Sequence, residues 1–369
     1  MLKIERIESF TGIKKDAWDA LLESAVNTSI FQTFEYQSIW WKHFGETSKR
    51  QLLLLVAIDD GVTVGIAPLM TERIPLVPNP VIKFVGSPVC DYIDFIIVKG
   101  REQEIISHFL SYIKKINFIE MNLAFIPEAS YTLRSQQVKS FLVDKSPYLD
   151  LDKNWDNTYK RLNKTIKKYV ARREKAAMKA GKLEFGYVKD REGIDIFLKD
   201  YFKIHVKRWR DFSGRYSQFQ YENWRNFVRE ISAIFLEKSY VDLSYLKLNS
   251  NIVACHFGFI FNNAFHWYMP TFNPDFARFS PGNIFIMRLL EHSANKGFMR
   301  FDFLRGEEPY KAMWTDSTKN LFRCLGYSER PLSNKTGHFY RLIKNFYTSK
   351  VKQQIKKIRP IMNIWYKAK

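Results

Sequence analysis

This sequence has few of the features that usually indicate the class and the location of a protein. It has three cysteines, Cys90, Cys255 and Cys324, an odd number spaced too widely for a zinc site or a disulfide framework. No apolar run approaches the roughly 20 residues that span a bilayer. The first ten residues lack the apolar core of a signal peptide. We therefore predict a protein of a reducing compartment, the cytoplasm, with no bound metal.

Acidic residues are also scarce, with 38 Asp and Glu against 58 Lys and Arg, a net charge of +20 and a pI near 9.6. This excess favours an acidic partner: a nucleotide cofactor, an acyl carrier protein, tRNA, an anionic polysaccharide precursor or a membrane surface. A generally lysine-rich proteome is the simpler alternative. The 46% hydrophobic content excludes disorder and indicates a packed globular chain.

Two segments concentrate the positive charge. Residues 151–182 read as one basic connecting helix, whose exposed face suits either an anionic partner or simple solvation. Residues 331–369 contain no acidic residue and alternate basic with apolar side chains. We predict a basic amphipathic tail here, which lies on an anionic membrane surface or docks on the body of the protein.

Periodicity predicts an α/β fold in which the same order of elements occurs twice. Two apolar runs around Asp60-Gly61 predict a β-hairpin over 52–70, and two more around Asn262-Asn263 predict another over 252–269. A helix follows the second hairpin from Ser280 and a strand covers 298–304. We expect an N-terminal domain at 1–150 and a C-terminal catalytic domain at 183–330.

The loop before that helix predicts an anion site. A glycine-containing helix N-terminus exposes backbone N–H groups and the positive end of the helix dipole, which is what a pyrophosphate needs. We assign cofactor binding to Arg278, Ser280, Gly282 and Asn283, although Pro281 removes one N–H donor.

No Ser-His-Asp or Cys-His signature stands out, so the catalytic base stays open. His256 has a suitable ordinary pKa, but a hydrogen-bonded structural histidine is the alternative reading. Asp302 is the other candidate, as a base or as the group that orients an amine. Asp91 and Asp94 begin an apolar strand, where they bind or deprotonate a substrate, or form a turn cap and an ion pair.

Six segments in order resemble one family: HFGF, WYMPTFNP, ARFSPGN, RFDFLRGEEPYK with Trp314, and in the N-terminal half FQTFEYQSIWWKHFG and FVGSPVCDYIDF. They are similar to the BioF2/CelD-like acetyltransferases of the GNAT superfamily, which are related to the FemABX peptidyltransferases. The resemblance implies two tandem GNAT-like domains, with mixed sheets flanked by helices. It also implies a cleft whose substrate-binding residues are Asp91, Tyr92, Asp94, Tyr268, Arg305, Tyr310, Lys311 and Trp314.

By this resemblance the chain is an N-acyltransferase whose co-substrate is acyl-CoA, most simply acetyl-CoA. The acceptor is a small-molecule or glycan-precursor amine, such as an amino sugar of a cell-envelope or polysaccharide precursor. One alternative is FemABX-like aminoacyl transfer from tRNA. The other is a non-catalytic module that joins a polysaccharide-synthesis complex at the inner face of the membrane.

Overall fold

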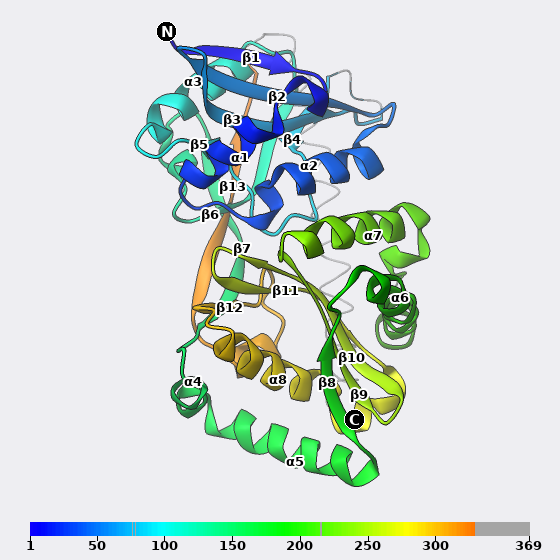
Figure 1. The fold of residues 1–369 in the computed structure, drawn as a ribbon. Coiled ribbons are helices and arrows are strands. Elements are labelled where there is room, and N and C mark those ends of the chain that lie inside the picture. Colours follow the sequence, from blue (N-terminus) through cyan, green and yellow to red (C-terminus); the bar gives the residue numbers. More distant parts are fainter. Residues whose placement is uncertain (76, 78, 215, 329–369) are drawn as a thin grey trace, which may run out of the picture.

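A computed structural model describes residues 1–328 apart from 76, 78 and 215. The predicted tail at 331–369 lies outside the described residues. Those residues form one mixed sheet of thirteen strands, which runs through the whole length of the molecule (Figure 1). Twelve of its strands follow the order β1-β2-β3-β4-β6-β13-β7-β12-β11-β10-β9-β8, and β5 pairs with β3 off this path.

The N-terminal half supplies the first strands of the sheet and three helices. The elements are β1 (Lys3–Ile7), α1 (Lys15–Ser24), α2 (Phe34–Trp40), β2 (Arg50–Asp59), β3 (Val62–Glu72), β4 (Val81–Phe84), β5 (Ile96–Ile97), α3 (Glu102–Lys114), β6 (Glu120–Pro127) and β7 (Lys139–Asp150). The predicted hairpin is confirmed as β2 and β3. Asp60 and Gly61 form its turn with φ of 48° and 80°, which the flexible Asp-Gly pair tolerates.

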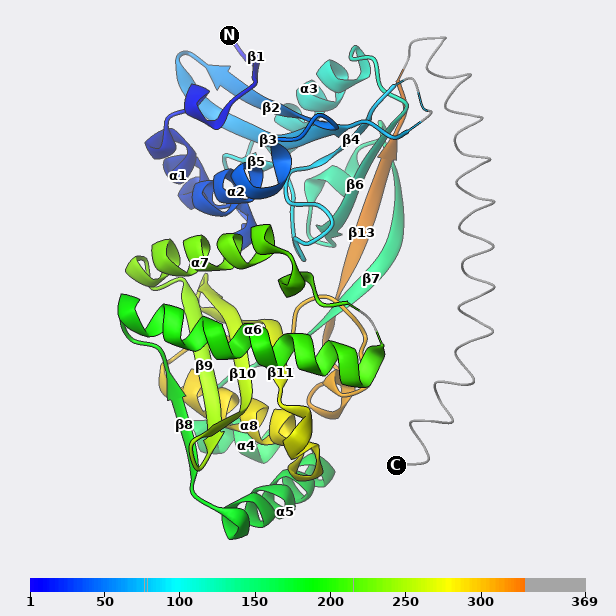
Figure 2. The same cartoon turned by 90° about the vertical axis from the view of Figure 1, so that its right-hand side faces the viewer.

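The C-terminal half contains a second group of helices and strands. They are α4 (Trp155–Arg161), α5 (Lys164–Ala180), β8 (Leu183–Tyr187), α6 (Arg191–Ser213), α7 (Glu222–Glu237), β9 (Val241–Leu248), β10 (Asn251–Phe261), β11 (Ala264–Phe272), α8 (Pro281–Asn295), β12 (Arg300–Asp302) and β13 (Thr318–Gly326). Helices α6 and α7 cover one face of β8–β11, and α5 and α8 lie on the other (Figure 2). The second predicted hairpin is confirmed as β10 and β11.

The last described strand does not stay beside its neighbours in sequence. β13 runs between β6 and β7, antiparallel to both, and so lies in the sheet of the first 150 residues. β7 also pairs with β12 at its far end, through Tyr148 and Asp302. The sheet is therefore continuous between the two halves. The domain predicted at 183–330 does not account for β13, which pairs with strands of the N-terminal half. The division into domains stays a prediction.

One local prediction is wrong. The expected single basic helix is broken at Leu162, which is extended with ψ of 147°, and the Asn163 side chain then caps α5 by accepting from the Thr165 amide. This cap gives a backbone amide at the start of α5 the hydrogen-bond partner that it would otherwise lack. Residues Tyr131–Arg134 form a 3₁₀ turn.

Aromatic side chains join the two halves on one side of the sheet. Phe31 and Tyr36, from the first half, contact Phe259 of β10 edge-on with ring centroids 5.9 and 6.2 Å apart. Tyr268 of β11 contacts Phe31 in the same way at 5.4 Å. These rings are almost fully buried, apart from Tyr268, so the halves share one apolar core, which fixes the position of β11 against the N-terminal half.

Candidate active site

The parallel strands β11 and β12 of the C-terminal half separate after a short paired stretch. β11 and β12 pair only through Ala264 with Arg300, Phe265 with Phe301 and His266 with Asp302. Beyond His266, β11 continues to Phe272, whereas β12 has already ended. A cavity of about 310 Å³ opens beside this free length of β11. Trp267, Thr271 and Phe272 form its strand side.

The opposite wall of this cavity is the N-terminus of α8, with Ser280, Gly282, Asn283 and Phe285. Arg208 of α6 and Tyr310 close its ends, and Trp267 Nε1 donates to the Tyr310 hydroxyl at 3.2 Å. Burial raises the pKa of Tyr310, so its hydroxyl stays neutral and able to donate. Apolar and aromatic walls with a few polar groups are typical of a small-molecule site. We name this space the cofactor cavity.

The start of α8 borders this space. Ser280 takes a left-handed conformation with φ of 51°, and Pro281 begins the helix. The Ser280 side chain makes no capping hydrogen bond, and its hydroxyl bonds instead to the Tyr169 hydroxyl of α5 at 2.6 Å. A Cβ at Gly282 would have no neighbour within 4 Å, so its backbone is open. The positive end of a 15-residue helix is therefore accessible to an anion.

Of the four predicted cofactor-binding residues, Arg278 stands apart. It does not line the cofactor cavity, and its guanidinium lies over the ring of Phe279, 4.7 Å from the centroid. Arg173 of α5 instead donates to the Arg278 carbonyl oxygen at 2.9 Å. Sequence reasoning missed Arg208 and Trp267 as cavity residues. The only sequence signals for these two residues are the helical pattern around Arg208 and the aromatic run that contains Trp267.

A second polar cluster forms where the chain leaves β12. Arg305 Nε lies 3.2 Å from Asp91 Oδ1, and its guanidinium also stacks over Phe125 at 3.7 Å. Asp91 is buried, with 11% of its side chain exposed. Burial raises the pKa of Asp91 to about 7, although Arg305 and Lys311 act in the opposite direction. A carboxyl that titrates near neutral pH can accept a proton under working conditions.

Asp302 lies in a different environment from Asp91. Its Oδ1 accepts hydrogen bonds from Tyr92, at 2.7 Å, and from the Leu304 amide, at 2.9 Å. Its Oδ2 lies 3.2 Å from Lys319 Nζ. Burial raises the pKa of Asp302, but Lys319, His266 and these hydrogen bonds outweigh it, and the net pKa is below the ordinary value. Asp302 is therefore an anion held in place by donors and a weak base.

His256 is fully enclosed. Its Nδ1 lies 3.4 Å from Asp242 Oδ1, and its Nε2 accepts from the Tyr268 amide at 3.2 Å. The ring stacks on Trp267 with centroids 4.6 Å apart. Burial lowers the pKa of His256 despite Asp242, so the ring is neutral. Both nitrogens already have protein partners, which fits the structural alternative better than a base that meets substrate.

The comparisons with known proteins bear on the same half of the chain. Residues 164–312, which include β11, the α8 N-terminus and Arg305, match the family model of the acetyltransferase (GNAT) domain. This segment is a GNAT acetyltransferase domain. The chain therefore carries an acyltransferase domain of GNAT type at these residues. No curated protein matches the sequence.

Solved structures share the GNAT fold over most of the chain. FemX is 13% identical with a TM-score of 0.62, over 89% of this chain and 98% of that one. The C-terminal domain of a putative lysylphosphatidylglycerol synthetase from Agrobacterium fabrum is 9% identical, with a TM-score of 0.55, over 84% and 90%. A protein of unknown function from Bacteroides thetaiotaomicron is 12% identical with a TM-score of 0.53, over 88% and 100%. The predicted GNAT-like α/β fold is confirmed, and the FemABX kinship and the narrower BioF2/CelD-like assignment stay predictions.

The remaining residues that were predicted for the site lie in different places in the fold. The Tyr268 hydroxyl donates to the Val89 carbonyl at 3.0 Å, beside Asp91. Asp94 accepts from Thr132 and from the Phe95 amide, as in the turn-cap alternative, and burial raises its pKa to about 6. Trp314 is buried in the core around α8, and among the residues that the structure describes its Nε1 has no hydrogen-bond partner. The structure thus brings Asp91, Tyr268, Arg305 and Lys311 together.

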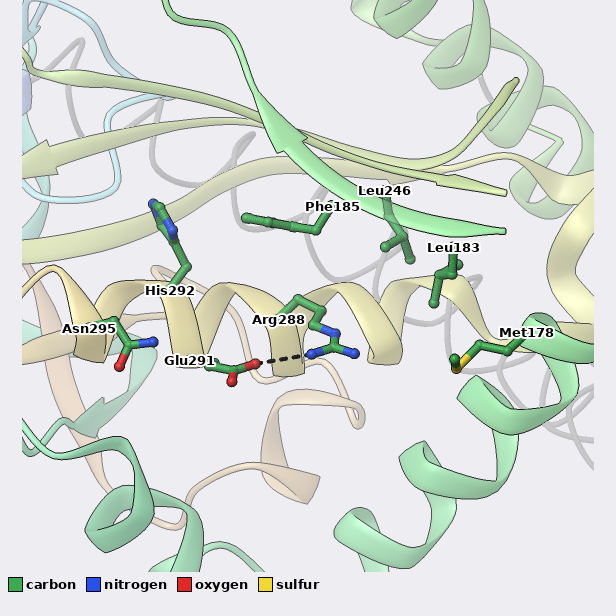
Figure 3. Close-up of a pocket in the computed structure, with 8 residues that line it drawn as sticks. All are labelled: Met178, Leu183, Phe185, Leu246, Arg288, Glu291, His292 and Asn295. Carbon is green, nitrogen blue, oxygen red and sulfur yellow. Dashed lines mark hydrogen bonds and ion pairs between the residues drawn. The ribbon is translucent and has the colours of Figure 1, made fainter. Parts of the chain in front are cut away.

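Another cavity of the GNAT domain, of about 290 Å³, lies at the far side of α8 (Figure 3). Phe185, Leu183 and Leu246 of the strands face Arg288 and His292 of the helix there. It contains none of the residues predicted from the sequence. Among the described residues there is no group of three or more His, Cys, Asp or Glu that could hold a metal ion. In the same part of the chain, no helix is long and apolar enough to cross a membrane.

Lys311 is a buried cation that fixes the loop after β12. Its Nζ donates to the carbonyl oxygens of Leu304, Arg305 and Gly306 at 3.1, 2.8 and 3.3 Å, and only 4% of it is exposed. We expect Lys311→Met to lower the free energy of unfolding by about 2–4 kcal/mol, because buried carbonyls lose a charged donor. Urea unfolding measures this. The control Lys145→Met removes a surface ion pair with Glu307 and is expected to cost less than about 1 kcal/mol. Equal costs for the two variants would contradict this role of Lys311.

Buried neutral histidines predict sensitivity to acid. Burial and the nearby Arg208 lower the pKa of His205 to about 3, and burial lowers that of His256. Unfolding exposes rings that protonate near pH 6.5, so this stability is present above that pH and is lost as the pH falls toward 3. We expect His205 to account for a loss of about 2 kcal/mol in the free energy of unfolding between pH 7 and pH 5, with a further loss from His256. Urea unfolding at both pH values measures it.

The variants His205→Gln and His108→Gln separate a buried ring from an exposed one. His205→Gln is expected to reduce the pH dependence, whereas His108→Gln leaves it unchanged. A pH dependence of stability that is equal in His205→Gln and in the wild type would refute the explanation.

Proposed function

We propose that this GNAT protein is an N-acyltransferase that moves an acyl group from acyl-CoA, most simply acetyl-CoA, to an amine. The acceptor we propose is an amino sugar or another amine of a cell-envelope or polysaccharide precursor. The observation that carries the proposal is the cofactor cavity, where the open α8 N-terminus faces the length of β11 that has lost its parallel neighbour.

The residues of the cofactor cavity suit a long anionic thioester. The amide at Gly282 and the dipole of α8 offer partners for phosphate, and Arg208 adds a positive charge in the same cavity. Trp267, Phe272 and Phe285 supply apolar and aromatic walls for an arm of the donor. We assign donor binding to Ser280, Gly282, Asn283, Arg208, Trp267 and Tyr310.

We assign the base role to Asp91. The acceptor nitrogen attacks the thioester carbonyl carbon, so that a C–N bond forms and the C–S bond breaks. Asp91 accepts the proton that nitrogen loses, and the departing thiolate takes up a proton to leave as a thiol. Because burial holds the pKa of Asp91 near 7, part of this carboxyl is ionised at neutral pH and it can still bind a proton. Arg305 orients Asp91 through the 3.2 Å ion pair. Positioning of the two reactants supplies much of the acceleration.

The donor is tested first by calorimetry with acetyl-CoA and longer acyl-CoAs, followed by thiol release in the presence of candidate amines. Micromolar binding and amine-dependent release of CoA are expected. Binding at no chain length would refute acyl-CoA as the donor.

Aminoacyl transfer from tRNA is the second candidate, and one surface favours it. Lys164, Lys168, Arg172, Lys175 and Lys179 follow each other at three- and four-residue spacing along α5 and are exposed. None of them forms an ion pair within the described residues. On the other side of α5, Tyr169 and Arg173 contact the Ser280 and Arg278 segment. Binding of tRNA that weakens steeply with salt, together with no binding of acyl-CoA, would favour aminoacyl transfer. An acyl carrier protein would also suit a basic surface.

A further inference from the structure

A second, larger cavity lies on the other face of the β11–β12 pair. It has a volume of about 510 Å³, and His266 and Asp302 line it. His266 precedes Trp267, which lines the cofactor cavity, and successive residues of a strand point to opposite faces of the sheet. The N-terminal half completes this cavity with Thr28, Ser29 and Tyr92. We name this space the interlobe cavity.

One buried polar group of the interlobe cavity is unpaired. His266 is 7% exposed, and within the described part of the chain its Nδ1 has no hydrogen-bond partner. Burial lowers the pKa of His266, with Lys319 acting in the same direction and Asp302 against it, so the ring is neutral. Each nitrogen of a neutral imidazole either donates or accepts a hydrogen bond, according to the tautomer, and leaving a buried one unpaired costs about 1–3 kcal/mol. A ligand that brings an O–H group would remove that cost.

The charges of the interlobe cavity cancel in pairs. Lys319 lies 3.2 Å from Asp302, and Arg300 lies 2.7 Å from Asp150. A chain with a net charge of +20 thus lines this cavity with two acids and two bases. Paired charges offer many donors and acceptors without a net field, which suits an uncharged polar ligand better than a phosphate or a polyamine.

We propose that the interlobe cavity binds the polyhydroxylated, uncharged part of the acceptor, as in a sugar ring, with His266 Nδ1 hydrogen-bonded to a ligand hydroxyl. Asn262, Asn263 and Thr28 also line the cavity, where the Asn262 side-chain amide donates to the Thr28 carbonyl and hydroxyl oxygens, each at 3.1 Å. This inference rests on the proposed acyltransferase function and names the substrate class for it.

The position of the interlobe cavity agrees with such a role. His266 and Asp302 are the last paired residues of β11 and β12, so the cavity lies at the base of the split in which the cofactor cavity opens. The Tyr92 hydroxyl that donates to Asp302 belongs to the residue next to Asp91. A sugar held there would present its amine from the sheet face opposite the donor.

The test uses the full chain saturated with CoA, so that no transfer occurs, with histidine labelled by ¹⁵N. D-Glucosamine, D-glucose and putrescine are added in turn. Saturable binding of both sugars that shifts the His266 ring nitrogen signals, with no response to putrescine, is the expected result. Binding of glucosamine and putrescine without glucose would mean recognition of the ammonium group and would overturn the proposal, as would binding of neither sugar.

Variants locate the binding. Ala264→Leu places a larger side chain in the interlobe cavity without removing a polar group, and should weaken sugar binding at least about 10-fold. Asn262→Gly keeps the left-handed turn, where Asn262 has φ of 47°, and should weaken it less. The control Ala176→Leu, on the exposed face of α5, should change nothing.

Sugar affinity that Ala264→Leu and Asn262→Gly both leave intact would overturn the site. The dissociation constant for acetyl-CoA is measured on the same variants and should stay within about 2-fold, because the donor lies on the other face. If acetyl-CoA fails to bind the wild type, the acyl-CoA function fails. If acetyl-CoA binds and the sugars do not, only the inference about the interlobe cavity fails.

Discussion

Asp91→Asn should lower kcat by about 10²–10⁴-fold, because the amide cannot accept the proton from the acceptor amine. In the wild type, kcat/KM should rise with pH and level off above a pKa of about 7, which is the pKa that burial gives the Asp91 carboxyl. The variant should lack this limb of the profile. Steady-state rates between pH 5.5 and 8.5 measure both effects.

Two other carboxyls test this assignment. Burial raises the pKa of Asp94 to about 6, whereas Lys319 and the hydrogen bonds hold that of Asp302 below its ordinary value. If Asp94→Asn or Asp302→Asn removes the pH limb and Asp91→Asn leaves it in place, Asp91 is not the base.

The pH dependence of the unfolding free energy gives a second test of the Asp91 pKa, and it does not require enzymatic activity. A carboxyl with a raised pKa in the folded state contributes stability at low pH, and this contribution is lost as the pH rises from about 4 through about 7. The wild type should therefore lose stability over this range through Asp91. Asp91→Asn should lack that loss, and urea unfolding at pH 4.5 and pH 8 compares the two proteins.

Gly282→Asp should weaken acetyl-CoA binding by roughly 100-fold, since a carboxylate near the donor's phosphates at the α8 N-terminus costs about 2–3 kcal/mol. The fold should tolerate the change. A Cβ at this position meets no atom within 4 Å, and a negative charge in the first turn stabilises a helix. Calorimetry gives the affinity, and thermal unfolding confirms the folded state.

The control for Gly282→Asp is Gly282→Asn, which has the same shape without the charge. It should retain most of the affinity for acetyl-CoA. Equal loss in both variants would point to steric exclusion, and no loss in either would place the donor phosphates away from α8.

Much of the fold follows from local patterns in the sequence. The two hairpins have Asp60-Gly61 and Asn262-Asn263 at left-handed turn positions, so local preference alone specifies them. Helix α8 has a strong apolar face and a turn at Gly297 with φ of 81°. The break at Leu162 was missed, because the basic and apolar residues on both sides continue the same helical period.

The sequence predicted which segments form the candidate site, but it predicted the roles of the individual residues less well. Asp91, Tyr268 and Arg305 come from three distant segments, and family resemblance placed them in one cleft. The sequence cannot show burial, and burial makes Asp91 a base near neutral pH while it encloses His256. Arg208 was missed for a similar reason, since only the packing of α6 against β11 brings its side chain to the cofactor cavity.

The position of β13 has a consequence for biosynthesis. During translation the first 150 residues leave the ribosome with β6 and β7 but without the strand that lies between them. That gap closes only when residues 318–326 emerge, after the whole GNAT domain has been made. Pairing across so much intervening chain forms slowly, and two strand edges stay open to wrong partners until it does. A nascent chain that stalls before Thr318 therefore exposes unpaired edges in both halves of the sheet.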